Sequence, residues 1–295
     1  MLLTIQPNES LRSFLERHTY LDSQAPSAIS LRKISRFYMR ASAIRVIAAA
    51  IGEDNCYGFN RLLRDHTSYP QLANFRQASQ VAYSGSIYRS GRTRFETESV
   101  RAAFCIACVK DDIESIGFAY WRRDHRYVNV CAKHNVVLLK RCPICKNDIA
   151  RHDYGYGHSL LWKGCKGRHV FEFCGEINYD SSERIYSQIY EEIGQSRFYL
   201  LRDELIQHLE EKSKDMAFSE EISGEQLEEI EARLELFRFS FPRIDSDYRP
   251  DNYYSQQFIR VVSIMYGSFR SLVDDIRQRG GAVKCIEDSM HVVSE

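Results

Sequence analysis

Two consecutive sets of cysteine and histidine residues in the middle of the chain have the spacing of metal ligands. The first set pairs Cys105 and Cys108 with Cys131 and His134, so that a Cys-x₂-Cys pair precedes a Cys-x₂-His pair. Two ligands separated by two residues can bind one ion from a single tight turn, and a second turn completes a tetrahedron. Because four protein ligands leave no position for a water, this set predicts a structural zinc ion.

The second set predicts another structural zinc ion, but the sequence leaves two main candidates for its fourth ligand. Its thiols are Cys142, Cys145 and Cys165. His169 closes the tetrahedron within one turn after Cys165, whereas Cys174 needs a longer loop, so we favour His169 and keep Cys174 as the alternative. His125, His152 and His158 are further alternatives for this fourth ligand, although we expect them to be solvated instead.

The chain of 295 residues has no apolar run of the length, about eighteen residues, that would indicate a membrane helix. It also begins without the features of a signal peptide. We therefore expect a cytoplasmic protein, in which clustered cysteines bind metal rather than form disulfides. Cys56 and Cys285 lie outside both sets and are expected to be small buried hydrophobic side chains.

Charge is unevenly distributed, although the formal net charge is zero. Basic residues outnumber acidic ones within 1–95 and within 101–171, and acidic residues predominate within 181–240. The basic part is a candidate for nucleic-acid contact, and the acidic helix around 225–235 is a candidate docking face for a basic partner. The alternative is that both are ordinary solvated surfaces.

Aromatic and basic residues alternate from Tyr120 to Tyr127, a pattern that can stack on bases and neutralise phosphates. We expect Trp121 to fill the small core beside the metal instead, and we leave the arginines of this stretch open. The sequence has no nucleophile elbow, phosphate-binding loop or paired-carboxylate motif. It therefore predicts a protein that is not an enzyme.

The pattern along the chain predicts a mainly α fold with small zinc-ribbon β elements. Three domains are expected: a helix-turn-helix-like N-terminal bundle at 1–95, a tandem zinc-ribbon domain at 96–178 and a helical C-terminal domain at 179–295.

Within these domains, apolar periodicity and capping residues predict the individual elements. N-terminal helices are expected at 8–21 with Asn8 as the N-cap, at 29–37, at 42–51 and near Tyr57. Short strands are expected at Tyr127–Val130 and Phe171–Phe173. C-terminal helices are expected from Ser181, from Gly224 and over Tyr253–Arg279, the last broken near Gly267.

The residues around the ligand sets resemble the TniQ/TnsD family of transposon target-selection proteins. The resemblance rests on Phe104-Cys-Ile-Ala-Cys108, Tyr120-Trp121-Arg122, Val130-Cys131-Ala-Lys-His134-Asn-Val-Val-Leu138 and Arg141-Cys142-Pro-Ile-Cys145. The segment Pro7–Arg17 is similar to the opening helix of the family. The sequence departs from the family pattern where the usual closing Cys pair stands as Cys165 with His169 or Cys174.

The resemblance implies an N-terminal helix-turn-helix region, a tandem zinc ribbon and a helical C-terminal part. It also implies a non-enzymatic, homodimeric adaptor that recognises a target and recruits an AAA+ ATPase, which brings the transposase. In one branch of the family a CRISPR effector complex with its guide RNA holds the target. In another branch the protein itself binds an attachment-site DNA sequence.

We favour the adaptor of RNA-guided transposition, with the effector complex, the AAA+ ATPase and target DNA as partners and with no membrane. The modest length after the zinc ribbons and the overall neutrality argue against DNA reading as its sole task. A sequence-specific attachment-site selector is the alternative, favoured by the basic residues of 1–95 and 101–171. A zinc-stabilised transcription factor outside the family is the third possibility.

Overall fold

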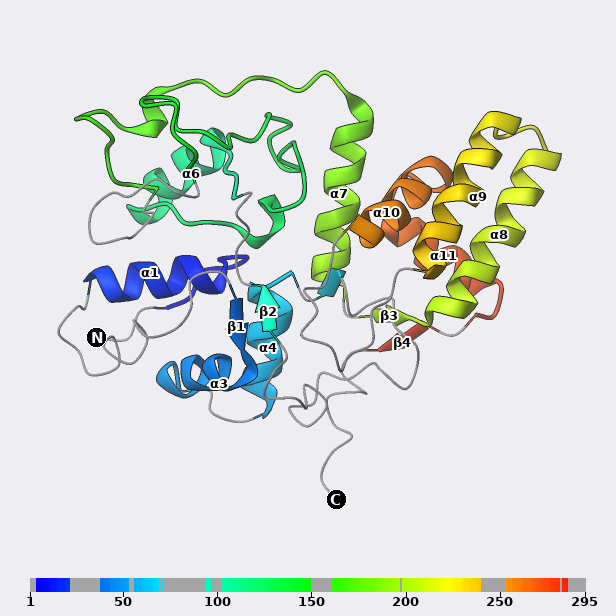
Figure 1. Cartoon of the computed structure of the whole chain (residues 1–295), viewed down its shortest axis with the longest axis horizontal. Helices are drawn as coiled ribbons and strands as arrows, with labels where there is room; N and C mark the ends of the chain where they lie inside the picture. The colour runs from blue at the N-terminus through cyan, green and yellow to red at the C-terminus, as the bar shows by residue number, and fades with distance from the viewer. Residues whose placement is uncertain are drawn as a thin grey trace. The chain divides into compact units, whose positions relative to one another are not determined.

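The computed structural model describes residues 4–21, 38–52, 56–68, 70–71, 94–96, 102–149, 161–196, 198–239, 253–281 and 283–285. Helices dominate these residues, and the named strands are three residues long (Figure 1). The mainly helical fold predicted from the sequence is therefore confirmed. No helix in these ranges is long and apolar enough to cross a membrane.

The chain divides into two compact units, each made of two segments. The first unit comprises Met1–Tyr69 and Gly91–Ser187, and the second comprises Pro70–Ser90 and Gln188–Glu295. The N-terminal helices thus belong to the same unit as both ligand sets. The three-domain division expected from the sequence stays a prediction.

The first unit opens with α1 (Leu11–Leu21), β1 (Tyr38–Arg40), α3 (Ala41–Ala50), α4 (Cys56–His66) and β2 (Arg94–Glu96). The two strands pair antiparallel, with Tyr38 opposite Glu96. Gly52 has a φ of 82°, which a residue without a Cβ adopts readily, and the chain turns there after α3. The helices predicted at 42–51 and near Tyr57 are confirmed, and the one predicted at 29–37 lies outside the described residues.

Ser10, not Asn8, caps α1. The backbone N–H of Ser13 donates to Ser10 Oγ at 3.2 Å, while Asn8 has a φ of 57° and lies before the helix. The expected start of this helix was therefore wrong. Its apolar face is buried through Leu11 and Phe14, as the three-residue spacing predicted.

The metal region, residues 102–149 and 161–180, has little regular structure. It contains α6 (Ile106–Ile116) and the 3₁₀ turns η2 (Arg123–His125) and η4 (Val170–Glu172), tied by isolated bridges. Its core packs cysteines of the ligand sets among apolar side chains, including Phe104, Trp121, Cys142, Ile149, Cys165 and Val170. In so small a core, ligands occupy positions that apolar residues fill in larger domains.

Neither short strand expected in the metal region forms. Tyr127–Val130 is reduced to one bridge, between Val130 and Val137. The strand expected at Phe171–Phe173 was wrong, because η4 occupies that segment. The carboxylate of Glu172 accepts the backbone N–H of His169 at 2.8 Å, which closes a tight turn in place of an extended strand.

The second unit consists mainly of packed helices. Its elements are the end of α7 (Ser181–Gln195), β3 (Phe198–Leu200), α8 (Arg202–Phe218), α9 (Gly224–Phe239), α10 (Tyr253–Met265), α11 (Phe269–Gln278) and β4 (Val283–Cys285). Helix α9 packs against both α8 and α10, where the Phe237 and Phe258 rings stack at 5.2 Å.

The helices predicted from Ser181, from Gly224 and over Tyr253–Arg279 are confirmed, including the break at Gly267. Helix α8 was missed. Its buried residues, Leu205, Ile206, Leu209, Ser213 and Met216, recur at three- and four-residue spacing, so the signal was present in the sequence.

Two candidate metal centres

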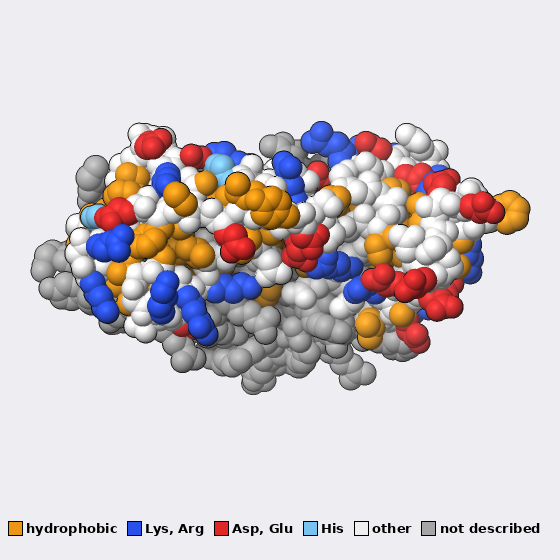
Figure 2. All heavy atoms as spheres, turned by 90° about the horizontal axis from the view of Figure 1, so that it is seen from above, with side chains coloured by type: hydrophobic (Ala, Val, Ile, Leu, Met, Phe, Trp, Pro, Cys, Tyr) orange, Lys and Arg blue, Asp and Glu red, His pale blue; other side chains and the backbone are white. Residues whose placement is uncertain are grey.

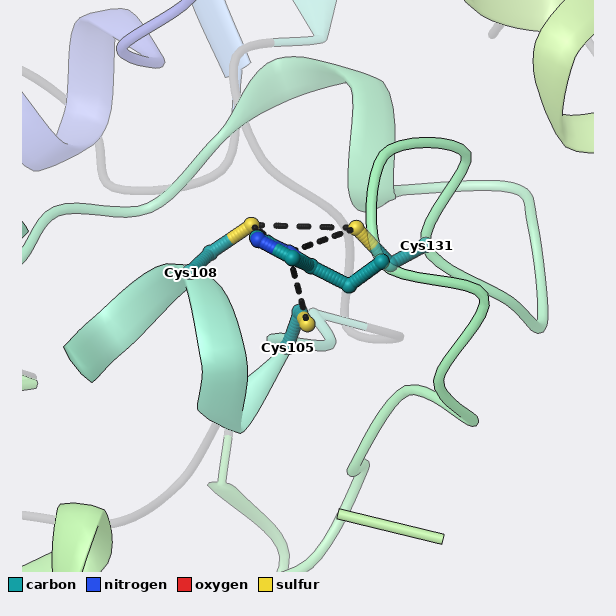
Figure 3. Close-up of side chains that lie close together, drawn as sticks. Cys105, Cys108 and Cys131 are labelled. Carbon is teal, nitrogen blue, oxygen red and sulfur yellow. Dashed lines mark hydrogen bonds between the residues drawn. The ribbon is translucent and has the colours of Figure 1, made fainter. Parts of the chain in front are cut away.

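The first cluster consists of Cys105, Cys108, Cys131 and His134. Their ligand atoms all lie within 4.8 Å of one another, and the cysteines are buried (Figure 3). The Cys108 and Cys131 sulfurs are 3.7 Å apart, and His134 Nδ1 lies 3.3 to 3.7 Å from the three sulfurs. A tetrahedral ion with ligand bonds of about 2.3 Å to sulfur and about 2.0 Å to nitrogen separates two sulfurs by about 3.8 Å and a sulfur from a nitrogen by about 3.5 Å. The cluster therefore has the dimensions of a tetrahedral metal site.

Two tight turns build this cluster. Cys105 directly precedes α6 and Cys108 lies in its first turn, where the positive end of the helix dipole favours thiolates. Hydrogen bonds from the thiols of Cys108 and Cys131 lower the pKa of Cys105 to about 3. In the other turn, the backbone N–H of Asn135 donates to the Cys131 carbonyl at 2.9 Å, which brings His134 back toward Cys131.

A carboxylate on α6 orients His134. Asp111 Oδ2 lies 3.0 Å from His134 Nε2 and also pairs with Lys133. A proton on Nε2 that donates to Asp111 leaves the Nδ1 lone pair free to face the three sulfurs. The imidazole thus presents its basic nitrogen to the cluster.

The second cluster consists of the thiols of Cys142, Cys145 and Cys165, whose sulfurs also lie within 4.8 Å of one another. The backbone N–H of Lys146 donates to the Cys142 carbonyl at 2.9 Å, and the Cys165 N–H donates to the Arg168 carbonyl at 2.7 Å. These two turns bring thiols from separate segments to one point. Three thiolates are a suitable donor set for a metal ion.

The structure does not bring His169 or Cys174 into the second cluster. The Cys174 side chain is exposed. The His169 ring stacks on Phe171 at 4.9 Å, and its buried Nδ1 has no hydrogen-bond partner in the described part of the chain. The choice between these two ligands therefore stays a prediction, and His152 and His158 lie outside the described residues.

His125 does not fit the expectation of a solvated side chain. It is 6% exposed, and its side chain helps to lower the pKa of the Cys131 thiol. The sequence gives no periodic signal for this contact, because η2 folds His125 back onto the first cluster. It lies beside the first cluster as a neighbour of one of its ligands.

Trp121 is buried and packs edge-on against Phe104, with ring centroids 6.0 Å apart. It fills the core beside the clusters, as the sequence predicted. Tyr127, at the other end of the same stretch, carries the guanidinium of Arg126 over its ring at 4.7 Å.

The arginines of the Tyr120–Tyr127 stretch are internal. Arg122 pairs with Asp112 at 2.7 Å. Arg123 donates to the backbone carbonyl of Arg64, and Arg126 donates to Ser68 Oγ at 2.9 Å. Because Arg123 and Arg126 are 5% and 7% exposed, this stretch does not offer phosphate ligands to a nucleic acid.

A polar seam, which sequence reasoning missed, joins the N-terminal segment to the metal region. The Ser10 N–H donates to the Trp121 carbonyl at 2.8 Å, and the Arg123 N–H donates to the Asn8 carbonyl at 3.0 Å. Glu9, which is fully buried, pairs with Arg17 at 2.7 Å. The segment before α1 is thereby held against the chain between the two pairs of the first cluster.

His66 extends this seam to α4. Its Nδ1 lies 2.8 Å from the Glu9 carbonyl, and burial lowers the pKa of His66 to about 4. A neutral imidazole donates one proton to that carbonyl. The charge of Glu9 is compensated by Arg17 rather than by His66.

Residues 1–138 match the sequence model of the TniQ family. The matched span contains α1, α3, α4 and every member of the first cluster, and it ends before Cys142. The second cluster lies beyond it. No curated protein matches the chain.

Proposed function

From the match of residues 1–138 to the TniQ family, we propose that the chain is a non-enzymatic adaptor of RNA-guided transposition. The family domain implies a transposition-associated target-selection protein. The adaptor links a CRISPR effector complex, with its guide RNA at target DNA, to the AAA+ ATPase that recruits the transposase. The family match is the observation that carries this proposal.

The internal arginines favour the adaptor over a direct DNA reader. Arg122, Arg123 and Arg126 are engaged with protein groups, so this basic stretch has no base-contacting role. The attachment-site selector remains the second candidate, because basic residues still outnumber acidic ones within 101–171.

The proposal includes two structural zinc ions, one in each cluster. Cys105, Cys108, Cys131 and His134 hold the first, which accounts for the tetrahedral spacing of their ligand atoms. The second is held by Cys142, Cys145 and Cys165, with His169 or Cys174 as the fourth ligand. Bound zinc supplies folding free energy and no reaction chemistry here.

The remaining features of the proposal concern the architecture and the assembly. The short helices α3 and α4 form part of a helix-turn-helix-like N-terminal domain, and the protein acts as a homodimer associated with DNA in the cytoplasm. The acidic helix α9 docks on a basic partner, because Glu225, Glu228 and Glu231 are all exposed on it.

Co-purification tests the function directly. A tagged effector complex loaded with guide RNA is expected to retain the full chain, and the chain is expected to retain the AAA+ ATPase. Tight, sequence-selective binding of the chain to naked duplex, without retention by the effector complex, would establish the attachment-site selector instead.

A charge-reversal variant tests the docking face. Glu228→Lys with Glu231→Lys is expected to abolish retention of one partner, whereas Glu229 is left in place because it pairs with Arg233 at 2.8 Å. The matched control is Glu114→Lys with Glu176→Lys, which reverses two exposed carboxylates of the metal region. Equal retention of both variants would refute the role of α9 and leave the adaptor proposal standing.

A further inference from the structure

Three exposed basic residues surround the second cluster, and we name them the basic rim: Arg141, Lys146 and Lys166. Each is the immediate neighbour of a cluster thiol, since they adjoin Cys142, Cys145 and Cys165 in the sequence. Because the three sulfurs lie within 4.8 Å of one another, the backbone positions of the rim gather around one point. Figure 2 shows Lys and Arg side chains recurring over the metal region.

The rim differs from Lys133, Lys140 and Arg168 of the metal region in having no partner. Lys133 pairs with Asp111, Lys140 donates to Asn129, and Arg168 pairs with Glu172. In the described part of the chain, no ion pair and no side-chain hydrogen bond engages any of the three rim side chains. Their charges face solvent.

The cluster turns hold the rim in fixed directions. Lys146 and Lys166 have φ values of 65° and 51°, a left-handed conformation that side chains other than glycine adopt uncommonly. In both places the conformation closes the turn that presents a thiol, through the Lys146 N–H to the Cys142 carbonyl and the Cys165 N–H to the Arg168 carbonyl. A metal held by these thiols therefore also orients the two lysines.

Neutralising the thiolates does not account for the whole rim. Three thiolates with a divalent ion and a histidine carry one net negative charge, and a fourth thiolate makes it two. The three positive charges of the rim exceed the negative charge of the metal site with either fourth ligand, so the surface around the second cluster stays positive.

We propose that the basic rim binds the phosphate backbone of duplex DNA without reading its sequence. Lysine is a compact point charge suited to phosphate, and contacts to phosphate position a protein on DNA without specifying bases. The inference rests on the proposed function, because target selection brings the chain to DNA. In that role the rim holds the protein over the target while its partner supplies the sequence information.

The test measures binding of the full, metal-loaded chain to a duplex of random sequence by fluorescence anisotropy across a salt series. Lys146→Gln with Lys166→Gln is expected to weaken binding about tenfold at low salt, and to reduce the slope of log K against log salt by about 2. The matched control, Arg184→Gln with Lys214→Gln, also removes two exposed positive charges and is expected to leave both quantities unchanged.

Metal content separates contact from unfolding. The rim variant is expected to retain as much zinc as the unmodified chain. If the rim variant loses metal, the test is repeated with Arg141→Gln, which does not alter a residue in the left-handed conformation. The slope of log K against log salt is then expected to fall by about 1. Equal binding and slope in rim variant and control, or no measurable binding of the unmodified chain at low salt, overturns the proposal.

A single-stranded RNA of the same length distinguishes the source of the phosphates. Tighter binding of the unmodified chain to duplex DNA than to the RNA supports the assignment of the rim to DNA. A rim variant that loses RNA binding but keeps DNA binding overturns it. Retention by the effector complex is measured in parallel on the same variant. If the rim variant binds DNA as well as the unmodified chain and is still retained by the effector complex, only the rim proposal is refuted. If the effector complex does not retain even the unmodified chain, only the adaptor proposal is refuted.

Discussion

The two metal clusters use similar turns but are connected to the rest of the protein differently. The first has four ligands in place, an orienting carboxylate in Asp111 and a neighbouring buried imidazole in His125. The second brings together three thiols, of which Cys145 is only half-buried, and it carries unpaired cations around it. The cysteines of both clusters are buried except Cys145, and Cys142 and Cys165 pack within the apolar core, so the second cluster differs in having no fourth ligand among the described residues and in the exposed cations beside it.

The N-terminal seam sharpens this difference. Glu9 and Ser10 contact the chain between the two ligand pairs of the first cluster, so folding of that cluster also positions α1. Among the described residues, the backbone hydrogen bonds that form the turns of the second cluster are local, although Cys142 and Cys165 lie with Trp121 in the shared apolar core. We therefore expect damage to the first cluster to spread further than damage to the second.

The largest expected effect comes from removing one ligand of each cluster. Cys105→Ser removes a metal whose binding contributes about 10 kcal/mol or more to folding, and it is expected to unfold α1 together with the metal region. Cys142→Ser is expected to lose one ion while α1 and the first cluster stay folded. Zinc content and amide hydrogen exchange of residues 4–21 distinguish the two, and equal exchange in both variants would contradict the difference.

A smaller effect is expected from the buried ion pair of the seam. Arg17→Met leaves the fully buried Glu9 carboxylate without its charge partner, and is expected to lower the free energy of unfolding by about 3–5 kcal/mol. Arg168→Met, which removes the exposed partner of Glu172 beside the second cluster, is expected to cost at most about 1 kcal/mol. Denaturant unfolding measures both, and a cost for Arg17→Met as small as that of Arg168→Met would show that the seam is not structural.

The pH dependence of the seam follows from His66. Burial lowers its pKa to about 4 from the ordinary histidine value of about 6.5, so the folded state disfavours the charged form. Its contribution is complete above pH 6.5 and is lost as the pH falls toward 4, by up to about 3 kcal/mol. Unfolding measured at several pH values is expected to show a shallower dependence for His66→Asn, and an unchanged dependence would rule out His66 as its source.

The smallest effect is expected at the orienting carboxylate. Asp111→Ala removes the acceptor of His134 Nε2 and is expected to weaken metal binding at the first cluster about 10- to 100-fold, without unfolding the chain. Glu114→Ala, on the same helix and exposed, is the control. Chelator competition measures the affinities, and equal values for the two variants would remove Asp111 from the site.

Local sequence was sufficient for elements whose residues interact with near neighbours. The Cys-x₂-Cys spacing predicted the turns of the first cluster, and apolar periodicity predicted α3, α4, α7, α9, α10 and α11. It failed at η4, where one carboxylate contact outweighed the strand propensity of Phe171 and Phe173. The missed α8 carried a readable pattern, so that failure was one of interpretation.

Long-range contacts decided what the basic residues do. Arg122, Arg123 and Lys146 are indistinguishable as charges in the sequence, yet the first two are paired within the fold and the third faces solvent. Pairing depends on partners far along the chain, such as the Arg64 carbonyl for Arg123. Composition counts a charge without showing what compensates it.

The sequence by itself determined the ligand types, their grouping into two sets, the helical character of the chain and the resemblance of residues 1–138 to the TniQ family. These follow from short spacings, because a turn or a helix is closed by residues a few positions apart. Only the tertiary structure decided that the N-terminal segment is held to the first cluster, that the central arginines are internal and that the second cluster presents free cations. Burial and pairing depend on segments that meet only when the chain folds, so no local pattern encodes them.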